Sequence, residues 1–250
     1  MPRLPLCHAE KVMQLTSAFE QDSHPPAPLL LAIDTCGPSG SVALGRLNGS
    51  AVEILGQVEL EGRSYSATLV TAVGQLLAAS GVELRNLAAI VAVNGPGSFT
   101  GVRVGLSAVK GLAEAARIPV AAVSRLEVLA ARAKLGSAAL DAHRHEVFLR
   151  LMRADREAAE ILAGAAELAL IDPAGARIAV CDDAAAALLV SAWPEAELLR
   201  TPSPTAADAL HLCVPRVLAG DFADLLLLDG HYLRRSDAEI FGEPGAQKRP

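Results

Sequence analysis

The sequence predicts an α/β protein with two related lobes, and three observations support this class. Hydrophobic residues make up 52% of the 250 residues but aromatic residues only 3%, so we expect a large, helix-rich core of alanine, leucine and valine. Short strand-like runs alternate with segments of helical periodicity from residue 29 onward. In the clearest case, an apolar run at 87–93 leads through a glycine-rich turn into a periodic apolar segment at 104–116, which indicates a buried strand, a loop and a helix.

The first lobe should begin with an antiparallel meander, because its first two strand-like runs are joined by a Gly-Pro-Ser-Gly turn and a third plausible strand follows. We expect strands at 29–33, 40–44 and 52–59, a helix at 65–80, a strand at 87–93, a helix at 104–116, a strand at 119–123 and a helix at 126–133. Ser124 can cap the last of these helices. Up to the strand at 119–123, this order of elements is that of one half of the actin-like ATPase (ASKHA, RNase H-like) fold.

The second half repeats this order less clearly. We expect strands at 137–140, 146–151 and 177–181, and helices at 184–193 and 206–218. Asp182 and Asp183 should cap the first of these helices. We place the first lobe at residues 28–123 and the second at 124–250, with a short C-terminal tail. Residues 1–27 contain several prolines and little periodicity, so we expect either a disordered arm or an overextended gene start.

The loop at 94–103 resembles an anion-binding loop, because the first N–H groups of a helix lack partners and lie at the positive end of its dipole. It matches neither common phosphate motif, however. Val102 and Arg103 stand where a Walker loop has lysine and serine or threonine, and the glycine spacing is too long for a dinucleotide fingerprint. A tight structural turn is the alternative interpretation.

The same loop closely resembles the hallmark block of the TsaB (YeaZ) family, which serves the synthesis of threonylcarbamoyladenosine in bacterial tRNA. The signature residues of this block are Gly95, Pro96, Gly97, Ser98, Phe99, Thr100, Gly101 and Arg103. Stretches at 29–35, 39–44, 137–148 and 231–235 also resemble the family, in the right order, so that the resemblance covers residues 28–239. The chain departs from the family at 63–66, where it lacks a usual histidine, so any contact of that histidine must be made differently.

The resemblance implies a non-catalytic role. According to the resemblance, this chain scaffolds and activates the catalytic subunit TsaD, which modifies adenine at tRNA position 37. TsaD would form a heterodimer with it, TsaE would be the third member, and the chain would form a homodimer when alone. A net charge of −6 argues against a broad phosphate-binding surface, so contact with tRNA should be indirect. A homodimeric structural protein without an enzyme partner is a further alternative.

The main alternative is an active actin-like ATPase or kinase that uses Asp34 and the loop from Gly95 to Gly101. Asp34 and Thr35 end the first strand, where such enzymes place an acid next to the metal and the phosphates. A turn cap is the simpler interpretation of Asp34. The second half lacks closely spaced glycines for the other phosphate loop and for an adenosine loop, so we expect a degenerate remnant of a nucleotide site, no cofactor and no enzymatic activity.

Metal and nucleophile chemistry find little support. His143 and His145 would share a face of a strand, but no third ligand is near in the sequence, so a solvated strand face is expected. The four cysteines are far apart and form no Cys-x-x-Cys pair, which fits thiols in a reducing cytoplasm better than a zinc site. Ser98 and Thr100 have no accompanying pattern of a histidine and an acid, so no protease is predicted.

The helix after the glycine loop has a thin face that favours close approach of another backbone, since glycine costs up to about 1 kcal/mol relative to alanine inside a helix. The expected partner interface comprises Leu69, Val73, Leu76, Gly101, Gly105, Ala108, Leu112 and Ala115. The sheet beneath is the alternative neighbour of this face. No apolar run reaches membrane-span length and the N-terminus lacks a signal-peptide pattern, so a cytoplasmic location without membrane contact is expected.

Overall fold

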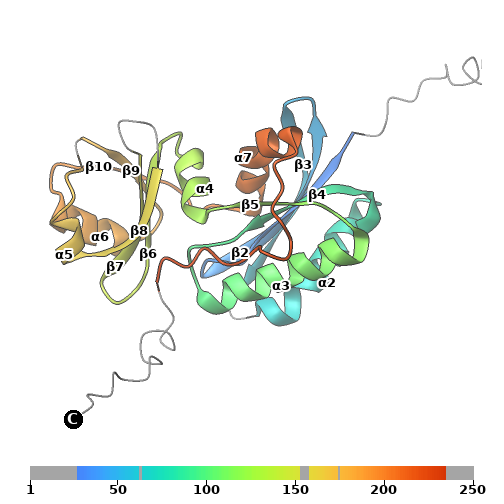
Figure 1. Cartoon of the computed structure of the whole chain (residues 1–250), viewed down its shortest axis with the longest axis horizontal. Coiled ribbons are helices and arrows are strands. Elements are labelled where there is room, and N and C mark those ends of the chain that lie inside the picture. Colours follow the sequence, from blue (N-terminus) through green and yellow to red (C-terminus); the bar gives the residue numbers. More distant parts are fainter. Residues whose placement is uncertain (1–26, 62–63, 153–157, 174, 235–250) are drawn as a thin grey trace, which may run out of the picture.

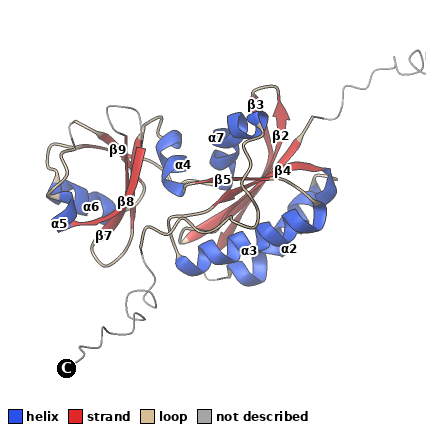
Figure 2. Ribbon diagram, in the orientation of Figure 1, coloured by secondary structure: helices blue, strands red, loops and turns tan. Residues whose placement is uncertain are grey.

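The computed structural model describes residues 27–61, 64–152, 158–173 and 175–234 as two α/β lobes that lie side by side (Figures 1 and 2). The predicted extension at 1–27 and the tail beyond 234 lie almost entirely outside these residues. None of the helices in the described part is both long and apolar enough to cross a bilayer.

The first sheet has five strands in the order β3-β2-β1-β4-β5. These are β1 (Leu29–Asp34), β2 (Ser39–Asn48), β3 (Ala51–Glu61), β4 (Leu87–Val93) and β5 (Val120–Val123). β1, β2 and β3 form the predicted antiparallel meander, and β4 and β5 continue the sheet in parallel with β1. β1 and β4 are buried along nearly their whole length, as expected for central strands covered on both faces.

The second sheet repeats this arrangement in the order β10-β9-β6-β7-β8. Its strands are β6 (Ser137–Asp141), β7 (Glu146–Met152), β8 (Ala158–Gly164), β9 (Arg177–Val180) and β10 (Glu197–Arg200). β6, β7 and β8 are antiparallel neighbours, while β9 and β10 run parallel to β6. The repeat confirms the predicted fold with two related lobes. Two strands, β8 and β10, and the short helix α5 (Ala165–Leu168) were not predicted from the sequence.

The helix that follows each sheet packs on the other sheet. α2 (Tyr65–Ala79) and α3 (Phe99–Ala116) pack side by side on one face of the first sheet, and α6 (Asp183–Ala192) packs on the second. α4 (Arg125–Arg132) follows the first sheet but packs on β6, β7 and β9, whereas α7 (Ala206–Ala219) follows the second sheet but packs on β1, β2 and β3. In Figure 1, α7 and the α2/α3 pair lie on opposite faces of the first sheet. A short 3₁₀ turn, η1 (Leu84–Asn86), precedes β4.

Side-chain caps fix where several helices begin. The Ser124 hydroxyl accepts a hydrogen bond from the Leu126 N–H at the start of α4, and the Asp182 carboxylate accepts one from the Ala185 N–H at the start of α6. Both residues were predicted as caps. Such caps stabilise a helix by about 1 kcal/mol because they satisfy otherwise unpaired N–H groups.

Candidate functional site

The glycine loop packs against the turn that follows β1. The Ser98 N–H donates to the carbonyl oxygen of Cys36 at 2.8 Å, and a Cβ built at Gly97 would overlap that same carbonyl group. The Ser98 hydroxyl in turn accepts a hydrogen bond from the Gly101 N–H at 3.2 Å. Two N–H groups that a bound anion would use therefore already have partners inside the lobe, which favours the structural-turn interpretation.

Two glycines of α3, Gly101 and Gly105, face inward. A Cβ at Gly101 would overlap the Thr35 carbonyl oxygen, and a Cβ at Gly105 would overlap the Thr35 hydroxyl. The Thr35 hydroxyl donates a hydrogen bond of 2.7 Å to the Gly101 carbonyl oxygen. These two glycines thus let α3 approach the end of β1. At these two positions the thin face of the helix packs on the sheet beneath, which was the alternative neighbour in the sequence analysis.

The other predicted interface residues divide by burial. Leu69, Val73 and Leu76 on α2 are buried in the core of the first lobe. On α3, Ala108 and Leu112 are half-buried and Ala115 is exposed. A partner can reach only the last three in the folded chain, together with the solvent face of α2.

The solvent face of α2 is unusual because none of the 15 residues of this helix is charged. We define the outer helix face as a set of uncharged, accessible residues on α2 and α3: Ala67, Val70, Thr71, Gly74, Ala78, Ala108, Leu112 and Ala115. Val70 is 61% exposed. Solvent-facing helix surfaces usually carry charges, so an uncharged face of small side chains has the character of a helix-packing surface.

Asp34 pairs with a residue that the sequence analysis missed. Arg125, the first residue of α4, places its Nε 3.2 Å from Asp34 Oδ2, and the two side chains are only 5% and 2% exposed. The Cys36 N–H donates to the other carboxylate oxygen at 2.8 Å. Burial alone would lower the pKa of Arg125, but the charge of Asp34 outweighs it, and the pKa is raised. No sequence pattern indicated this pair, because its members are 91 residues apart.

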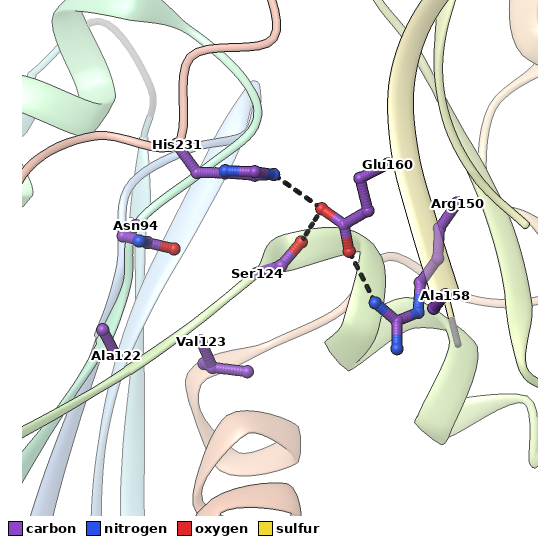
Figure 3. A pocket seen from close by; sticks show the side chains of 8 residues that line it. All are labelled: Asn94, Ala122, Val123, Ser124, Arg150, Ala158, Glu160 and His231. Carbon is purple, nitrogen blue, oxygen red and sulfur yellow. Dashed lines mark hydrogen bonds and ion pairs between the residues drawn. The ribbon is translucent and has the colours of Figure 1, made fainter. Parts of the chain in front are cut away.

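A pocket of about 350 Å³ lies between the lobes, with Glu160 at its centre (Figure 3). Glu160 accepts hydrogen bonds from Ser124 Oγ at 2.7 Å and Arg150 Nη1 at 2.8 Å, and lies 2.8 Å from His231 Nε2. Burial alone would raise the pKa of Glu160, but the hydrogen bonds from His231, Ser124 and Arg150 outweigh it, and the pKa is lowered. The serine and the histidine both contact the carboxylate, so the histidine does not activate the serine as it would in a catalytic triad.

The C-terminal segment returns to the glycine loop. The His231 N–H donates to the Asn94 carbonyl oxygen at 2.7 Å, and the Tyr232 ring packs on Phe99 with 5.2 Å between ring centroids. The Arg103 guanidinium lies 3.7 Å from the centroid of the same Phe99 ring. Two blocks that carried the family resemblance separately in the sequence are therefore one cluster in space.

The histidine pair is not on a strand, so that prediction was wrong. His143, Arg144 and His145 form the turn between β6 and β7, with left-handed φ values of 60°, 56° and 60°. A strand face would require extended backbone, which this tight connection excludes. In the part of the chain that the structure describes, no three His, Cys, Asp or Glu side chains gather as a metal site.

The described cysteines are free thiols, of which Cys36 and Cys213 are buried. Burial, as the largest cause, raises the pKa of Cys36 and of Cys181, and raises that of Cys213 to about 12. A raised pKa leaves little thiolate at neutral pH, so none of these three has the character of a nucleophile.

Comparison with known proteins places this geometry in a family. A family model described as tRNA N6-adenosine threonylcarbamoyltransferase (TsaD) matches residues 56–178. The tRNA threonylcarbamoyladenosine biosynthesis protein TsaB of Bacillus subtilis is 36% identical over 126 residues, which are 49% of this chain and 54% of the relative. The chain spans about half the length of the curated TsaB relatives it matches.

Two solved structures from Pseudomonas aeruginosa match over a longer range. An uncharacterized protein with similarity to peptidase YeaZ superimposes with a TM-score of 0.68 at 31% identity, covering 83% of this chain and 100% of that one. YeaZ itself superimposes with a TM-score of 0.65 at 29% identity, covering 82% of this chain and 100% of that one. With the first structure matched over its full length, and with the signature loop and the C-terminal block joined in one cluster, the chain belongs to the TsaB (YeaZ) family.

Proposed function

We propose that this chain is a non-catalytic subunit of the bacterial complex that forms threonylcarbamoyladenosine at tRNA position 37, where it scaffolds and activates the catalytic subunit TsaD. The names of its curated relatives place them in the biosynthesis of this nucleoside. The observation that carries the scaffold role is the outer helix face, which is uncharged along the whole of α2. Two helices that present small side chains can pack closely against two helices of a partner.

The partners follow from this role. TsaD would form a heterodimer with the chain through the outer helix face, and TsaE would join as the third member. Without TsaD the same face would pair two copies of the chain as a homodimer. With a net charge of −6 the chain would contact tRNA only through the complex. A cytoplasmic location fits this pathway.

The alternative of an active ATPase or kinase is disfavoured by the surroundings of Asp34. An acid that coordinates a metal ion next to phosphates needs a carboxylate oxygen open to the cleft. Both carboxylate oxygens of Asp34 are instead engaged, one by Arg125 and one by the Cys36 N–H, and the side chain is buried. A pseudo-enzyme role agrees better with this geometry.

The test is a charge placed on the outer helix face. Val70→Glu should leave the monomer folded, because the side chain at this position is 61% exposed. The same change should weaken binding to TsaD of the same organism by about a hundredfold, or about 2.8 kcal/mol, because the interface would bury an unpaired carboxylate. Binding is measured by titration calorimetry, and threonylcarbamoyladenosine formation is measured in the reconstituted system.

The matched control is Val190→Glu. Val190 is a similarly exposed valine, at 54%, but lies on α6 in the other lobe. The Val190→Glu variant should bind TsaD with the affinity of the wild type. Equal TsaD affinity for both variants and the wild type would show that the outer helix face is not the interface, and absence of any TsaD binding by the wild type would refute the scaffold function itself.

A further inference from the structure

The side chain of Arg125 fills an enclosed site between the two lobes. Its Nε lies 3.2 Å from Asp34 Oδ2, and its side chain is 5% exposed. A Cβ built at Gly37 would overlap the guanidinium, so the turn after β1 packs directly against the guanidinium. Few arginines in folded proteins are buried so completely, and they need a buried anion close by to offset the loss of hydration.

The site lies where strand ends of both sheets converge. Asp34 is the last residue of β1, and Arg125 begins α4, the helix that crosses from the first sheet to the second. Cys181, directly after β9 of the second sheet, is close enough to act electrostatically on the guanidinium. The carboxyl ends of parallel strands are where α/β folds usually bind charged ligands.

The Arg125 backbone also holds this position. Its N–H donates to the Gly95 carbonyl oxygen at 2.6 Å, which ties the start of α4 to the glycine loop. The guanidinium is therefore anchored by its own main chain on the first lobe while its helix packs on the second. Moving the lobes apart while α4 stays on the second sheet would therefore have to break both ties of Arg125 to the first lobe, and it would leave two buried charges unpaired.

We propose that Asp34 is the anion of a cation site between the lobes, and that Arg125 occupies this site permanently as a built-in cation that holds the lobes closed. The closed arrangement then needs neither a metal ion nor a nucleotide. This inference concerns the lobes of the single chain and does not depend on the proposed partner TsaD.

The experiment removes the built-in cation and supplies an external one. Arg125→Ala should have a lower Tm than the wild type and a larger radius of gyration by small-angle scattering. Guanidinium chloride at a millimolar, sub-denaturing concentration should raise the Tm of this variant and restore the smaller radius, while tetramethylammonium chloride at the same ionic strength should not. The wild type should not respond to either salt. Asp34→Asn added to Arg125→Ala should abolish the response to guanidinium.

A surface pair supplies the control. Arg177 Nε lies 2.9 Å from Glu197 Oε1, but both side chains are more than half exposed. Arg177→Ala should show no guanidinium-dependent change. A response of the same size in Arg177→Ala, or a response that survives Asp34→Asn, would show a general salt effect and would overturn the proposal, as would an Arg125→Ala variant with the Tm and radius of the wild type.

If Arg125→Ala does not fold in buffer, its refolding in the presence of guanidinium tests whether an external cation can replace the missing side chain. Folding that requires guanidinium supports the built-in cation. If neither condition gives folded protein, the double variant Asp34→Asn, Arg125→Met removes both charges at similar volume and should fold. An enlarged radius in this double variant supports the proposal, and the compact radius of the wild type overturns it.

Discussion

Gly105 of α3 lies directly against the side chain of Thr35 at the end of β1, with no room between them for a Cβ. The Thr35 hydroxyl is held there by its hydrogen bond to the Gly101 carbonyl oxygen one turn earlier in the helix. This contact fixes how closely α3 approaches the sheet. It also explains why a helix that faces a packed core carries glycine at this position, despite the conformational cost.

Gly105→Ala should therefore destabilise the chain. Overpacking of this kind costs about 1–3 kcal/mol. The expected result is a lower free energy of unfolding, measured by urea denaturation. Gly111→Ala on the same helix is the control, because Gly111 is exposed and a Cβ there would meet nothing within 4 Å. It should gain up to about 1 kcal/mol from helix propensity. Equal effects of the two substitutions would contradict the close contact with Thr35.

The pKa of Glu160 predicts part of the acid sensitivity. Because the folded pKa is lowered, the ionised carboxylate stabilises the fold at pH above its unfolded value of about 4.3, and this contribution is lost as the pH falls through the lower folded value. Glu160→Gln should thus be less stable than the wild type at pH 7, and the difference should shrink on acidification below about pH 4.3. Thermal melts of the variant and the wild type across this pH range measure the difference in stability. Glu195→Gln, at an exposed position, should show no such convergence.

The packing of α7 across the two lobes predicts cooperative unfolding. Trp193 is the only tryptophan of the chain and is buried in the second lobe, where its Nε1–H donates to the Leu168 carbonyl oxygen at 3.0 Å. Its fluorescence reports on that lobe alone, whereas far-ultraviolet circular dichroism reports on both. Since α7 of the second lobe covers the sheet of the first, we expect the two urea transitions to coincide. Separate midpoints would mean that the lobes unfold independently.

The raised thiol pKa values predict slow alkylation. Cys36 and Cys213 are buried, and the pKa of Cys213 is about 12, so little thiolate forms at pH 8. Iodoacetamide should modify neither residue in the native chain and both in urea, as mapped by peptide mass spectrometry. Modification of either one under conditions where circular dichroism remains native would contradict this environment.

Much of the first lobe could be predicted because its local signals agree with its tertiary environment. The apolar runs of β1 and β4, and the run of β2 after the Gly-Pro-Ser-Gly turn, have strand patterns, and each becomes a strand. β8 is different. Its sequence, Ala-Ala-Glu-Ile-Leu-Ala-Gly, is rich in helix-forming residues, and its pairing with β7 overrides that preference. β10 and α5 have only four residues each, too few for a periodic pattern.

The site residues were harder to predict because they meet across long distances in sequence. The glycine loop was visible as a motif, but its packing on Thr35 and Cys36 depends on how α3 docks on the sheet. Asp34 and Arg125 are 91 residues apart, and Glu160 and His231 are 71 residues apart. Nothing local distinguishes Arg125 from a solvated arginine at the start of a helix. Only the folded arrangement shows that its charge is buried.

The packing of α7 on the first sheet also limits how this gene can be divided. A fragment that ends after β5 would lack Leu210, Cys213 and Val214, the α7 side chains that cover one face of its sheet. That face would be left as a bare apolar surface, prone to aggregate. The complementary fragment would carry α7 with nothing to cover. Split into two polypeptides between β5 and α4, the protein could regain its fold only by reassembly of both pieces, because α7 of the second piece completes the sheet of the first.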